Sequence, residues 1–366
     1  MELRKLFLQN FRSYAQAELE LHPGVNLLLG DNGVGKTNLL EAVTYLSMGH
    51  SFRTRKEREM IKLGEDFCEM KAEIFSSDRV QELRALLFAD NRRRQLFLSG
   101  IKEKTFAPLS GRLRTVMFSP GDLTILQSGG SARRRLLDDA LCQLRPAYEH
   151  ALTKYTRALD SKNRILKDRY EDASLLDLLP EYNTQLCTYG AEIIRTRADY
   201  MQWLGRYTAE FHRDFSGEKE SLELQYQTDS AVQNPQAPAQ EIAQALGEHI
   251  ARRERAELES GTCLIGPHRD DFEVLCNGMS LKSYGSQGQT RTAAISLKLA
   301  ERKIFLQDTG EEPVLLLDDV LSELDAARQD FVLNRLKSGQ VLITCCEKDR
   351  ITDIGKTFFV EKGSVK

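Results

Sequence analysis

The spacing of apolar residues along the chain changes twice and divides the sequence into three parts. Up to about residue 125, apolar residues alternate with polar ones or form short blocks, as strands require. This pattern predicts strands at Glu2–Leu8, Ala17–Leu21, Val25–Leu29, Met70–Phe75, Gln81–Leu87, Gln95–Leu98 and Thr115–Phe118. From about residue 265 onward, short apolar blocks such as Val314–Leu317 and Gln340–Thr344 return and alternate with helix-forming segments.

The middle of the chain has the periodicity of long helices. Two stripes of apolar and aromatic residues recur mostly at steps of three and four: Tyr148, Leu152, Tyr155, Leu159 and Leu166, then Tyr182, Leu186, Tyr189, Ile193, Thr196, Tyr200, Trp203 and Tyr207. Such spacing is typical of helices packed lengthwise, and the polar segment Arg169–Pro180 between the stripes predicts a turn. We expect an antiparallel arm whose aromatic stripe forms its own core; the alternative is a base-stacking surface. A connector at Gln233–Pro238 and a charged helix at Ala239–Glu259 follow.

These patterns predict an α/β protein in which one head is assembled from both ends of the chain. The first part of the head is expected at residues 1–128 and the last part at residues 263–366. The helical arm, residues 129–262, is inserted between them.

The predicted strand Val25–Leu29 leads directly into the sequence GDNGVGKT, which is followed by a helix-forming segment. These positions fit the G-x-x-x-x-G-K-[ST] phosphate loop, in which backbone N–H groups surround phosphate oxygens. Lys36 is expected to reach the terminal phosphates and Thr37 to bind Mg²⁺. The other interpretation is a glycine-rich turn that precedes Lys-Thr by chance. The predicted nucleotide-binding residues are Gly30, Asp31, Asn32, Gly33, Val34, Gly35, Lys36 and Thr37.

Two further segments near the end of the chain carry candidate chemistry. The apolar block that begins at Pro313 ends on two carboxylates, Asp318 and Asp319. The segment YGSQGQTR begins a predicted helix at Thr292–Lys303, and a helix start with free N–H groups favours anions. One chain gains little from two phosphate-binding helix ends, whereas two facing chains can enclose a nucleotide between them. The alternative is that this segment only caps its helix.

Composition describes a globular protein without a membrane span. Of the 366 residues, 41% are hydrophobic and 29% are charged. No apolar run approaches the roughly eighteen residues that a spanning helix needs. The seven cysteines lack C-x-x-C spacing, so reduced thiols and a cytoplasmic location are expected.

The net charge of −3 does not by itself indicate a nucleic-acid-binding protein, but the basic residues are clustered. One cluster contains Arg53, Arg55, Lys56 and Arg58; a second contains Arg92, Arg93 and Arg94; a third contains Arg133, Arg134 and Arg135. Each could be a solvated surface. Together they favour a local positive surface that binds phosphates, with Arg53, Arg55, Arg92, Arg93 and Arg94 as candidate DNA contacts.

The order of the motifs resembles one family closely. L-x-L-x-N-F-R-S-Y, GDNGVGKTNLLEA, GHSFRT, MFSPGDL, RRRLLDD, GPHRDD, SYGSQGQTR and LLLDDVLSELD follow one another along nearly the whole chain. In this order they resemble the RecF family of bacterial replication and repair proteins, whose fold is an SMC-like, ABC-type ATPase head. SQGQ is similar to the ABC signature motif, and LSELD is similar to the D-loop after Walker B.

The resemblance implies an ATP-controlled DNA-binding protein of the cytoplasm. Such proteins act with RecR and RecO to load RecA at single-strand gaps, and they support replication recovery and SOS induction. By the same resemblance, Asp318 supports Mg²⁺, Asp319 positions the attacking water, and Asp325 lies at the seam of an ATP-dependent homodimer. Ser286, Gly288 and Gln289 then contact ATP held by the other subunit. Single-stranded, gapped or junction DNA is the expected partner, and no membrane is.

Three departures from the ABC pattern favour a slow ATPase that times dimerisation. Asp319 stands where these heads commonly carry glutamate, Cys345 and Cys346 occupy the place of the switch histidine, and Gln127 is late for the Q-loop glutamine. His268 in GPHRD is expected to anchor its loop, because no second metal ligand stands at the usual spacing. Two other function classes share features of this chain. A transporter-type ABC subunit would have more compact motif spacing, and an SMC-like tether would need a longer coiled coil.

Overall fold

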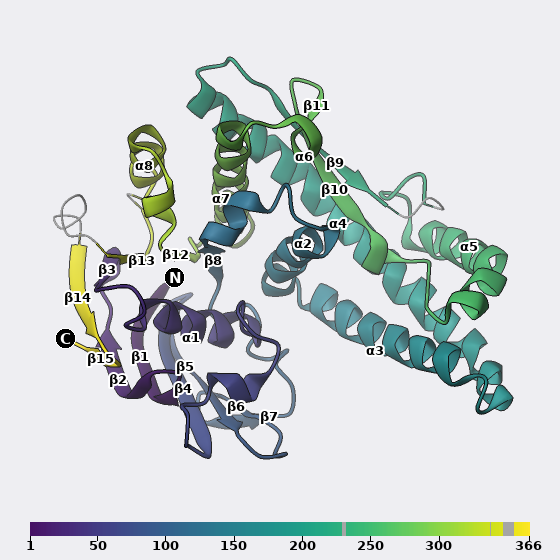
Figure 1. The fold of residues 1–366 in the computed structure, drawn as a ribbon, viewed down its shortest axis with the longest axis horizontal. Helices are drawn as coiled ribbons and strands as arrows, with labels where there is room; N and C mark the ends of the chain where they lie inside the picture. Colours follow the sequence, from purple (N-terminus) through teal and green to yellow (C-terminus); the bar gives the residue numbers. More distant parts are fainter. Residues whose placement is uncertain (229–231, 337, 347–354) are drawn as a thin grey trace. The chain divides into compact units, whose positions relative to one another are not determined.

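The computed structural model describes residues 1–228, 232–336, 338–346 and 355–366, and it contains two compact units (Figure 1). The first unit combines Met1–Thr124 with Ala294–Lys366, and the second is Ile125–Ala293. Both chain ends therefore belong to one unit. The second unit extends to Ala293 and includes β10 (Asp271–Cys276), which pairs along its whole length with β9 (Leu222–Gln227).

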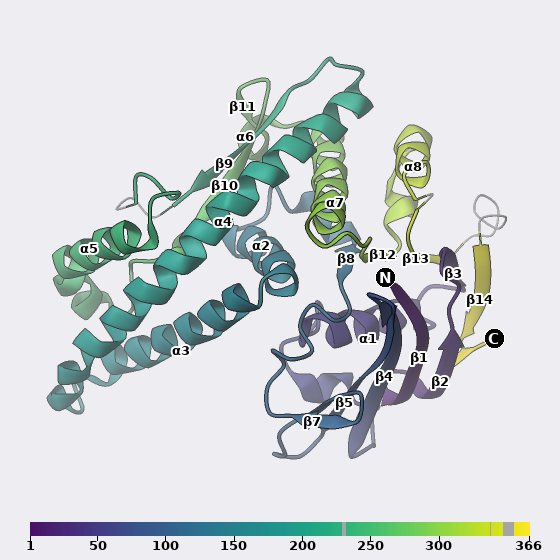
Figure 2. The same cartoon turned by 180° about the vertical axis from the view of Figure 1, so that it is seen from behind.

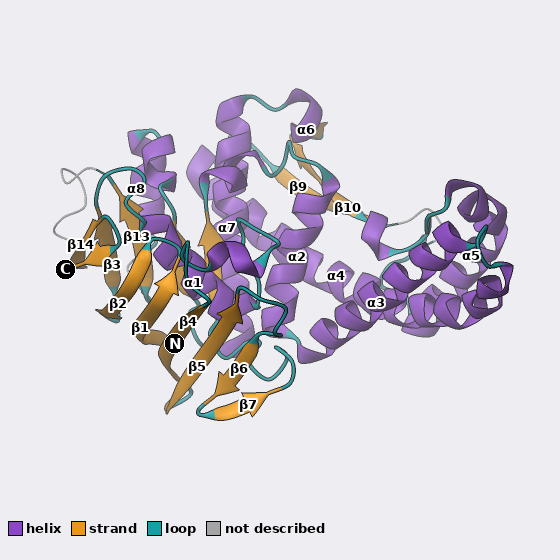
Figure 3. Ribbon diagram, turned by 60° about the horizontal axis from the view of Figure 1, so that its bottom comes forward, coloured by secondary structure: helices purple, strands orange, loops and turns teal. Residues whose placement is uncertain are grey.

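An antiparallel sheet in the first unit has the strand order β2-β1-β4-β5-β6-β7 (Figure 3). Its strands are β1 (Glu2–Phe11), β2 (Tyr14–Glu20), β4 (Phe67–Ser76), β5 (Arg79–Phe88), β6 (Gln95–Leu98) and β7 (Ile101–Glu103). Apolar residues at alternate positions, such as Leu6 and Leu8 of β1, are fully buried while their neighbours are more exposed. Period-two alternation therefore produces a sheet with one face in the core.

The second sheet of this unit is mainly parallel, with the order β15-β14-β3-β13-β12-β8. It consists of β3 (Val25–Leu29), β8 (Thr115–Phe118), β12 (Val314–Leu317), β13 (Val341–Cys345), β14 (Gly355–Glu361) and β15 (Ser364–Val365). Every residue of β3, β8 and β12 is buried, which explains why these strands are mostly apolar, with Asn26 and Thr115 as buried polar exceptions. The carboxyl ends of β3, β12 and β13 meet at one edge.

Helix α1 (Lys36–Met48) contacts both sheets, and its buried residues share one core with them. Leu39, Leu40 and Val43 of α1 belong to the same cluster as Leu6 of β1 and Leu316 of β12. Because this helix begins inside the phosphate loop, burial of its apolar side fixes the position of the loop. The unit also contains α8 (Ala326–Leu333) and three 3-10 helices at Glu57–Met60, Pro120–Thr124 and Val320–Glu323.

The second unit is mostly helical (Figure 2). Its helices are α2 (Gly130–Leu144), α3 (Pro146–Asp168), α4 (Leu179–Ser216), α5 (Ala239–Ser260) and α6 (Leu281–Tyr284), with 3-10 turns at Ala173–Leu178 and Pro267–Arg269. A three-stranded sheet, β11-β10-β9, adds β11 (Met279–Ser280). Helix α7 (Gln287–Thr309) begins in this unit and ends in the first.

The expected pairing of long helices is present, since α3 and α4 pack along each other and α4 also contacts α5. Four tyrosines of the predicted stripes, Tyr148, Tyr155, Tyr200 and Tyr207, are buried, whereas Tyr182 and Tyr189 are partly exposed. Trp203 differs, because half of its surface is exposed and its ring stacks on Tyr207. Among the described residues, no helix combines the length and the apolarity needed to cross a bilayer.

Candidate nucleotide site

The phosphate loop connects the end of β3 to the start of α1 and depends on two glycines. Gly35 has φ of 116°, and a side-chain carbon placed there would lie 2.7 Å from Ser13 Oγ. At Gly30 such a carbon would lie 2.3 Å from the backbone oxygen of Val360. No other residue fits either position without displacement of backbone or neighbours. Tyr14 adds a hydrogen bond of 3.0 Å from its hydroxyl to the Gly35 oxygen.

Lys36 lies inside the curve of the loop. Its ammonium group donates to the backbone oxygens of Gly30 at 2.8 Å and Asp31 at 3.0 Å. Lys36 as a whole is only 3% exposed. Cys346, after β13, places its Sγ 3.3 Å from the same nitrogen. A buried cation surrounded by neutral acceptors is well suited to bind phosphate oxygens.

Asp318, at the end of β12, receives two hydroxyl donors on one oxygen. Thr37 Oγ1 donates to Asp318 Oδ1 at 2.8 Å, and Thr344 Oγ1 donates to the same atom at 3.1 Å. Burial raises the pKa of Asp318 above its ordinary value, although both hydrogen bonds oppose this shift. A carboxylate beside a threonine hydroxyl at the end of a phosphate loop is the oxygen-ligand set that Mg²⁺ prefers.

Asp319 adopts a left-handed conformation with φ of 49° directly after this carboxylate. Its backbone N–H donates to Thr344 Oγ1 at 2.7 Å, so one threonine hydroxyl connects both aspartates. Aspartate tolerates this region better than most residues, and the bend turns the chain into the 3-10 helix Val320–Glu323. The side chain of Asp319 stays partly exposed at the site.

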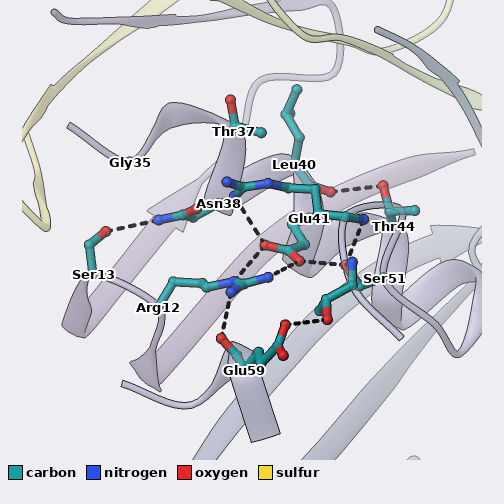
Figure 4. A network of polar contacts seen from close by, with 12 residues as sticks. Arg12, Ser13, Gly35, Thr37, Asn38, Leu40, Glu41, Thr44, Ser51 and Glu59 are labelled. Carbon is teal, nitrogen blue, oxygen red and sulfur yellow. Dashed lines mark hydrogen bonds and ion pairs between the residues drawn. The ribbon is translucent and has the colours of Figure 1, made fainter. Parts of the chain in front are cut away.

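Glu41 of α1 is a buried carboxylate on the helix that follows the loop (Figure 4). Arg12 donates to its two oxygens at 2.9 and 2.6 Å, and Ser51 Oγ donates at 2.5 Å. Arg53 lies 3.4 Å from the same carboxylate and donates to Asn38 Oδ1 at 2.8 Å. Arg53 thus braces the first turn of α1, whatever else it contacts.

The predicted signature residues lie in the second unit, at the start of α7. Ser286 and Gln289 form a reciprocal capping box, in which Gln289 N donates to Ser286 Oγ at 3.2 Å and Ser286 N donates to Gln289 Oε1 at 3.1 Å. Ser286 is exposed, and Gly288 and Gln289 are partly exposed. Gln289 Nε2 also donates to Glu220 Oε1 at 2.8 Å.

The remaining predicted residues differ in their surroundings. Asp325 caps α8 by accepting from Arg328 N at 2.9 Å. Arg55 and Arg93 are exposed, and Arg92 pairs with Asp90 at 2.8 Å.

Like Arg53 of the first basic cluster, arginines of the second and third clusters have internal partners that a charge count does not reveal. Arg94 donates to Tyr45 Oη at 3.0 Å and to Gly49 O and Glu57 Oε1 at 2.7 Å. In the third cluster Arg133 is 2% exposed and forms a two-pronged ion pair with Asp271 at 2.6 and 2.7 Å. These arginines therefore have structural roles.

Sequence reasoning missed Thr344, Glu41 and Arg12. Thr344 is a polar residue that closes an apolar strand, and Glu41 is a charged residue on the buried side of α1. Those breaks in the apolar pattern were the available signal.

Comparison with known proteins places this geometry in a family. The family model described as "RecF/RecN/SMC N terminal domain" matches residues 2–364. The chain is similar to "DNA replication and repair protein RecF" of Clostridium perfringens (strain SM101 / Type A), with 35% identity and complete coverage of both chains.

Solved structures agree with this relationship. The fold is similar to "Structure of the recombination mediator protein RecF-ATP in RecFOR pathway", with a TM-score of 0.92, 36% identity and coverage of 100% of this chain and 96% of that one. An Smc head domain from Pyrococcus furiosus, at 16% identity and a TM-score of 0.56 over 100% of this chain and 95% of that one, shares the fold alone. The expected ATPase-head fold is thus confirmed, and the chain belongs to the RecF family.

Proposed function

We propose that this chain is an ATP-dependent, DNA-binding recombination mediator. One observation carries the proposal. Lys36 and Thr37, at the end of a complete phosphate loop, and Asp318 all lie at the carboxyl edge of a parallel sheet. Parallel α/β sheets bind their ligands at this edge. The RecF-ATP structure, similar over the whole chain, supports ATP as the nucleotide.

The residues divide the work of binding and hydrolysis. The backbone N–H groups of Gly33 to Thr37 and the Lys36 ammonium would receive the phosphates, while Thr37 and Asp318 would hold Mg²⁺. When bound, Mg²⁺ neutralises phosphate charge. Asp319 positions the attacking water, and Thr344 binds both the Asp318 carboxylate and the backbone N–H of Asp319.

Hydrolysis is expected to be slow. Asp319 is one methylene shorter than the glutamate that ABC heads usually carry, so it reaches less far toward a water molecule. The position of the switch histidine is taken by Cys345 and Cys346 after Thr344. Gln127, the candidate for the Q-loop glutamine, lies in the second unit with its Nε2 3.5 Å from Thr290 Oγ1. Slow turnover suits a timer that limits the lifetime of an ATP-bound dimer.

Dimerisation is the expected consequence of ATP binding. Ser286, Gly288 and Gln289 of one chain would contact the γ-phosphate held by the other, with Asp325 at the seam. The exposed side chain of Ser286, at the N-terminal end of α7, supports this role. The capping box would have to exchange its internal hydrogen bonds for bonds to phosphate.

DNA, RecR and RecO are the proposed macromolecular partners, in a cytoplasmic role that supports RecA loading, replication recovery and the SOS response. The relative described as acting in DNA replication and repair supports this role. Arg55 and Arg93 are the preferred DNA contacts because both are exposed, and Arg92 adds to them beside its pairing with Asp90. Arg53 and Arg94 contribute charge from positions fixed by internal bonds.

The proposal is tested by measuring ATP hydrolysis with gapped, single-stranded and duplex DNA and without DNA. We expect a low basal rate that gapped DNA increases, and no activity in Lys36→Met, which lacks the phosphate-binding cation. A rate that is indifferent to every DNA would contradict a DNA-repair role while leaving an ATPase. Equal activity of Lys36→Met would contradict the nucleotide site itself.

A further inference from the structure

Three side chains with metal-binding atoms converge in the second unit, away from the phosphate loop in sequence. They are His212 near the end of α4, Glu220 in the turn before β9, and Cys276 at the end of β10. One ligand atom from each lies within 4.8 Å of the others. His212 Nε2 is 2.9 Å from Glu220 Oε2.

The local fold explains why these residues meet. Helix α4 ends at a left-handed Gly217, and Glu218 also has a positive φ of 65°, so the chain reverses within two residues. The reversal brings Glu220 back beside His212. Strand β9 then pairs with β10 in a register that places Cys276 opposite Leu222. The cluster is thus fixed by a helix end, a turn and a strand pair.

The surroundings suit a metal ligand set. His212 is fully buried, Cys276 is 3% exposed, and the Glu220 side chain is 25% exposed. A neutral imidazole can bind a metal through either of its two ring nitrogens. His212 Nδ1 has no hydrogen-bond partner among the described residues. Nitrogen, thiolate sulfur and carboxylate oxygen together are typical ligands of Zn²⁺.

A plainer interpretation is a histidine–glutamate hydrogen bond with a buried thiol beside it. Two observations favour a metal site over this. Across the described ranges, this is the one group of three His, Cys, Asp or Glu side chains with convergent ligand atoms, although Cys68 and Cys263 are equally buried thiols. The Cys276 thiol also adds sulfur to the imidazole nitrogen of His212 and the carboxylate oxygen of Glu220, so the group offers three different kinds of ligand atom.

We propose that His212, Glu220 and Cys276 bind a zinc-class divalent ion, with the thiol proton of Cys276 released on binding. The ion would fix the orientation of Glu220, whose Oε2 faces His212 and whose Oε1 accepts from Gln289 Nε2 at 2.8 Å. Metal occupancy would therefore set the position of Gln289 at the start of α7. This last step bears on activity only through the proposed role of Gln289, whereas metal binding itself does not depend on that role.

The test uses the full chain, stripped with a chelator and titrated with Co²⁺ and then Zn²⁺ without nucleotide or DNA. We expect one Co²⁺ per chain, with a near-ultraviolet thiolate-to-cobalt absorption that Zn²⁺ abolishes. Cys276→Ser should remove the absorption, and Glu220→Gln should weaken binding by more than the roughly 10- to 100-fold that loss of an outer-shell partner causes. Cys263→Ser is the matched control, since Cys263 is 2% exposed but lies outside the cluster. It should bind as wild type.

X-ray absorption of the zinc-loaded wild-type chain gives an answer that does not depend on variant folding. A first shell with one sulfur and the rest nitrogen or oxygen is expected. Absence of bound metal, a shell without sulfur, or unchanged Co²⁺ absorption in Cys276→Ser would each overturn the proposal. These measurements use neither nucleotide nor DNA, so failure of the metal site and failure of the proposed function are distinguishable.

Discussion

At the scale of single residues, the site depends on the Thr344 hydroxyl, which forms hydrogen bonds with both Asp318 and Asp319. Thr344 donates to Asp318 and accepts from the backbone N–H of Asp319. A buried carboxylate loses the solvation of water, so each hydrogen bond to it contributes more than one at the surface. The geometry of Asp318 and Asp319 is therefore set partly by the neighbouring strand β13.

Thr344→Val keeps the shape of the side chain and removes this hydroxyl. We expect a loss of about 1–3 kcal/mol in the free energy of unfolding, because the N–H of Asp319 loses its acceptor. Mg²⁺-dependent ATP binding should weaken as well, since Asp318 becomes freer to rotate. Chemical denaturation and nucleotide titration measure the two effects. Thr357→Val, a threonine of β14 in the same sheet, serves as a control, and equal effects of both variants would contradict a specific role of Thr344.

Asp319→Asn changes only the proposed positioning group. The amide cannot accept a proton from water, so hydrolysis should fall by a factor of about 10²–10⁴ while ATP still binds. ATP-bound dimers should accordingly last longer. Single-turnover hydrolysis and nucleotide affinity separate the two properties. Hydrolysis at the wild-type rate would show that another group positions the water.

At the scale of elements, two backbone N–H groups at the start of α7, those of Ser286 and Gln289, already have hydrogen-bond acceptors within one chain. The capping box between Ser286 and Gln289 stabilises the helix, so the sequence SQGQ has a structural role even without a partner. A trans role requires something further, which is the exposure of Ser286.

Ser286→Arg distinguishes a trans contact from a simple cap. A bulky side chain cannot fit beside a γ-phosphate, so we expect ATP binding by the monomer to be nearly intact and ATP-driven dimerisation to be abolished. Ser286→Ala should cost about 1 kcal/mol of stability as a lost cap and impair dimerisation less. Nucleotide titration followed by sizing in saturating ATP checks both variants. If Ser286→Arg binds ATP and dimerises normally, the segment is only a cap.

The strands that the sequence predicts with correct bounds share one property: a few consecutive residues are enough to show the apolar pattern and where it ends. β3, β6, β8 and β12 have the predicted bounds because short, mostly apolar segments end sharply at polar or glycine residues. β9 was missed because its alternation is short and follows a long helix. Its pairing with β10 joins segments that are distant in sequence.

The same distinction applies to the site. Lys36, Thr37 and the glycines of the loop follow a local spacing, so the sequence alone indicates them. Thr344 and Arg12 act through partners elsewhere in the chain, and only the fold reveals those pairs. Likewise, the internal bonds of Arg94 and Arg133 do not follow from a run of basic residues.

At the scale of the whole molecule, a nearly neutral chain can bind DNA only through a local concentration of charge. We predict that the double variant Arg55→Ala, Arg93→Ala lowers DNA affinity and reduces the slope of log affinity against log salt. The slope should change by about 0.9 for each duplex phosphate that the variant no longer neutralises. Binding isotherms at several salt concentrations measure it. ATP affinity should stay the same.

Arg164→Ala, Arg255→Ala is the matched control, because it removes equal charge from exposed ion pairs on α3 and α5. An unchanged salt slope in the Arg55 and Arg93 variant, or an equal change in both variants, would show that the DNA surface lies elsewhere.

The central claim is that the γ-phosphate of ATP joins two copies of this chain. Light scattering of the purified protein with ATP and Mg²⁺, with ADP and Mg²⁺, and without nucleotide tests it most directly. We expect twice the mass of the 41.6 kDa chain only in ATP, because ADP lacks the group that a partner's Ser286 would contact. Lys36→Met should remain monomeric in every condition. An equal dimer fraction in ADP and ATP would contradict the account.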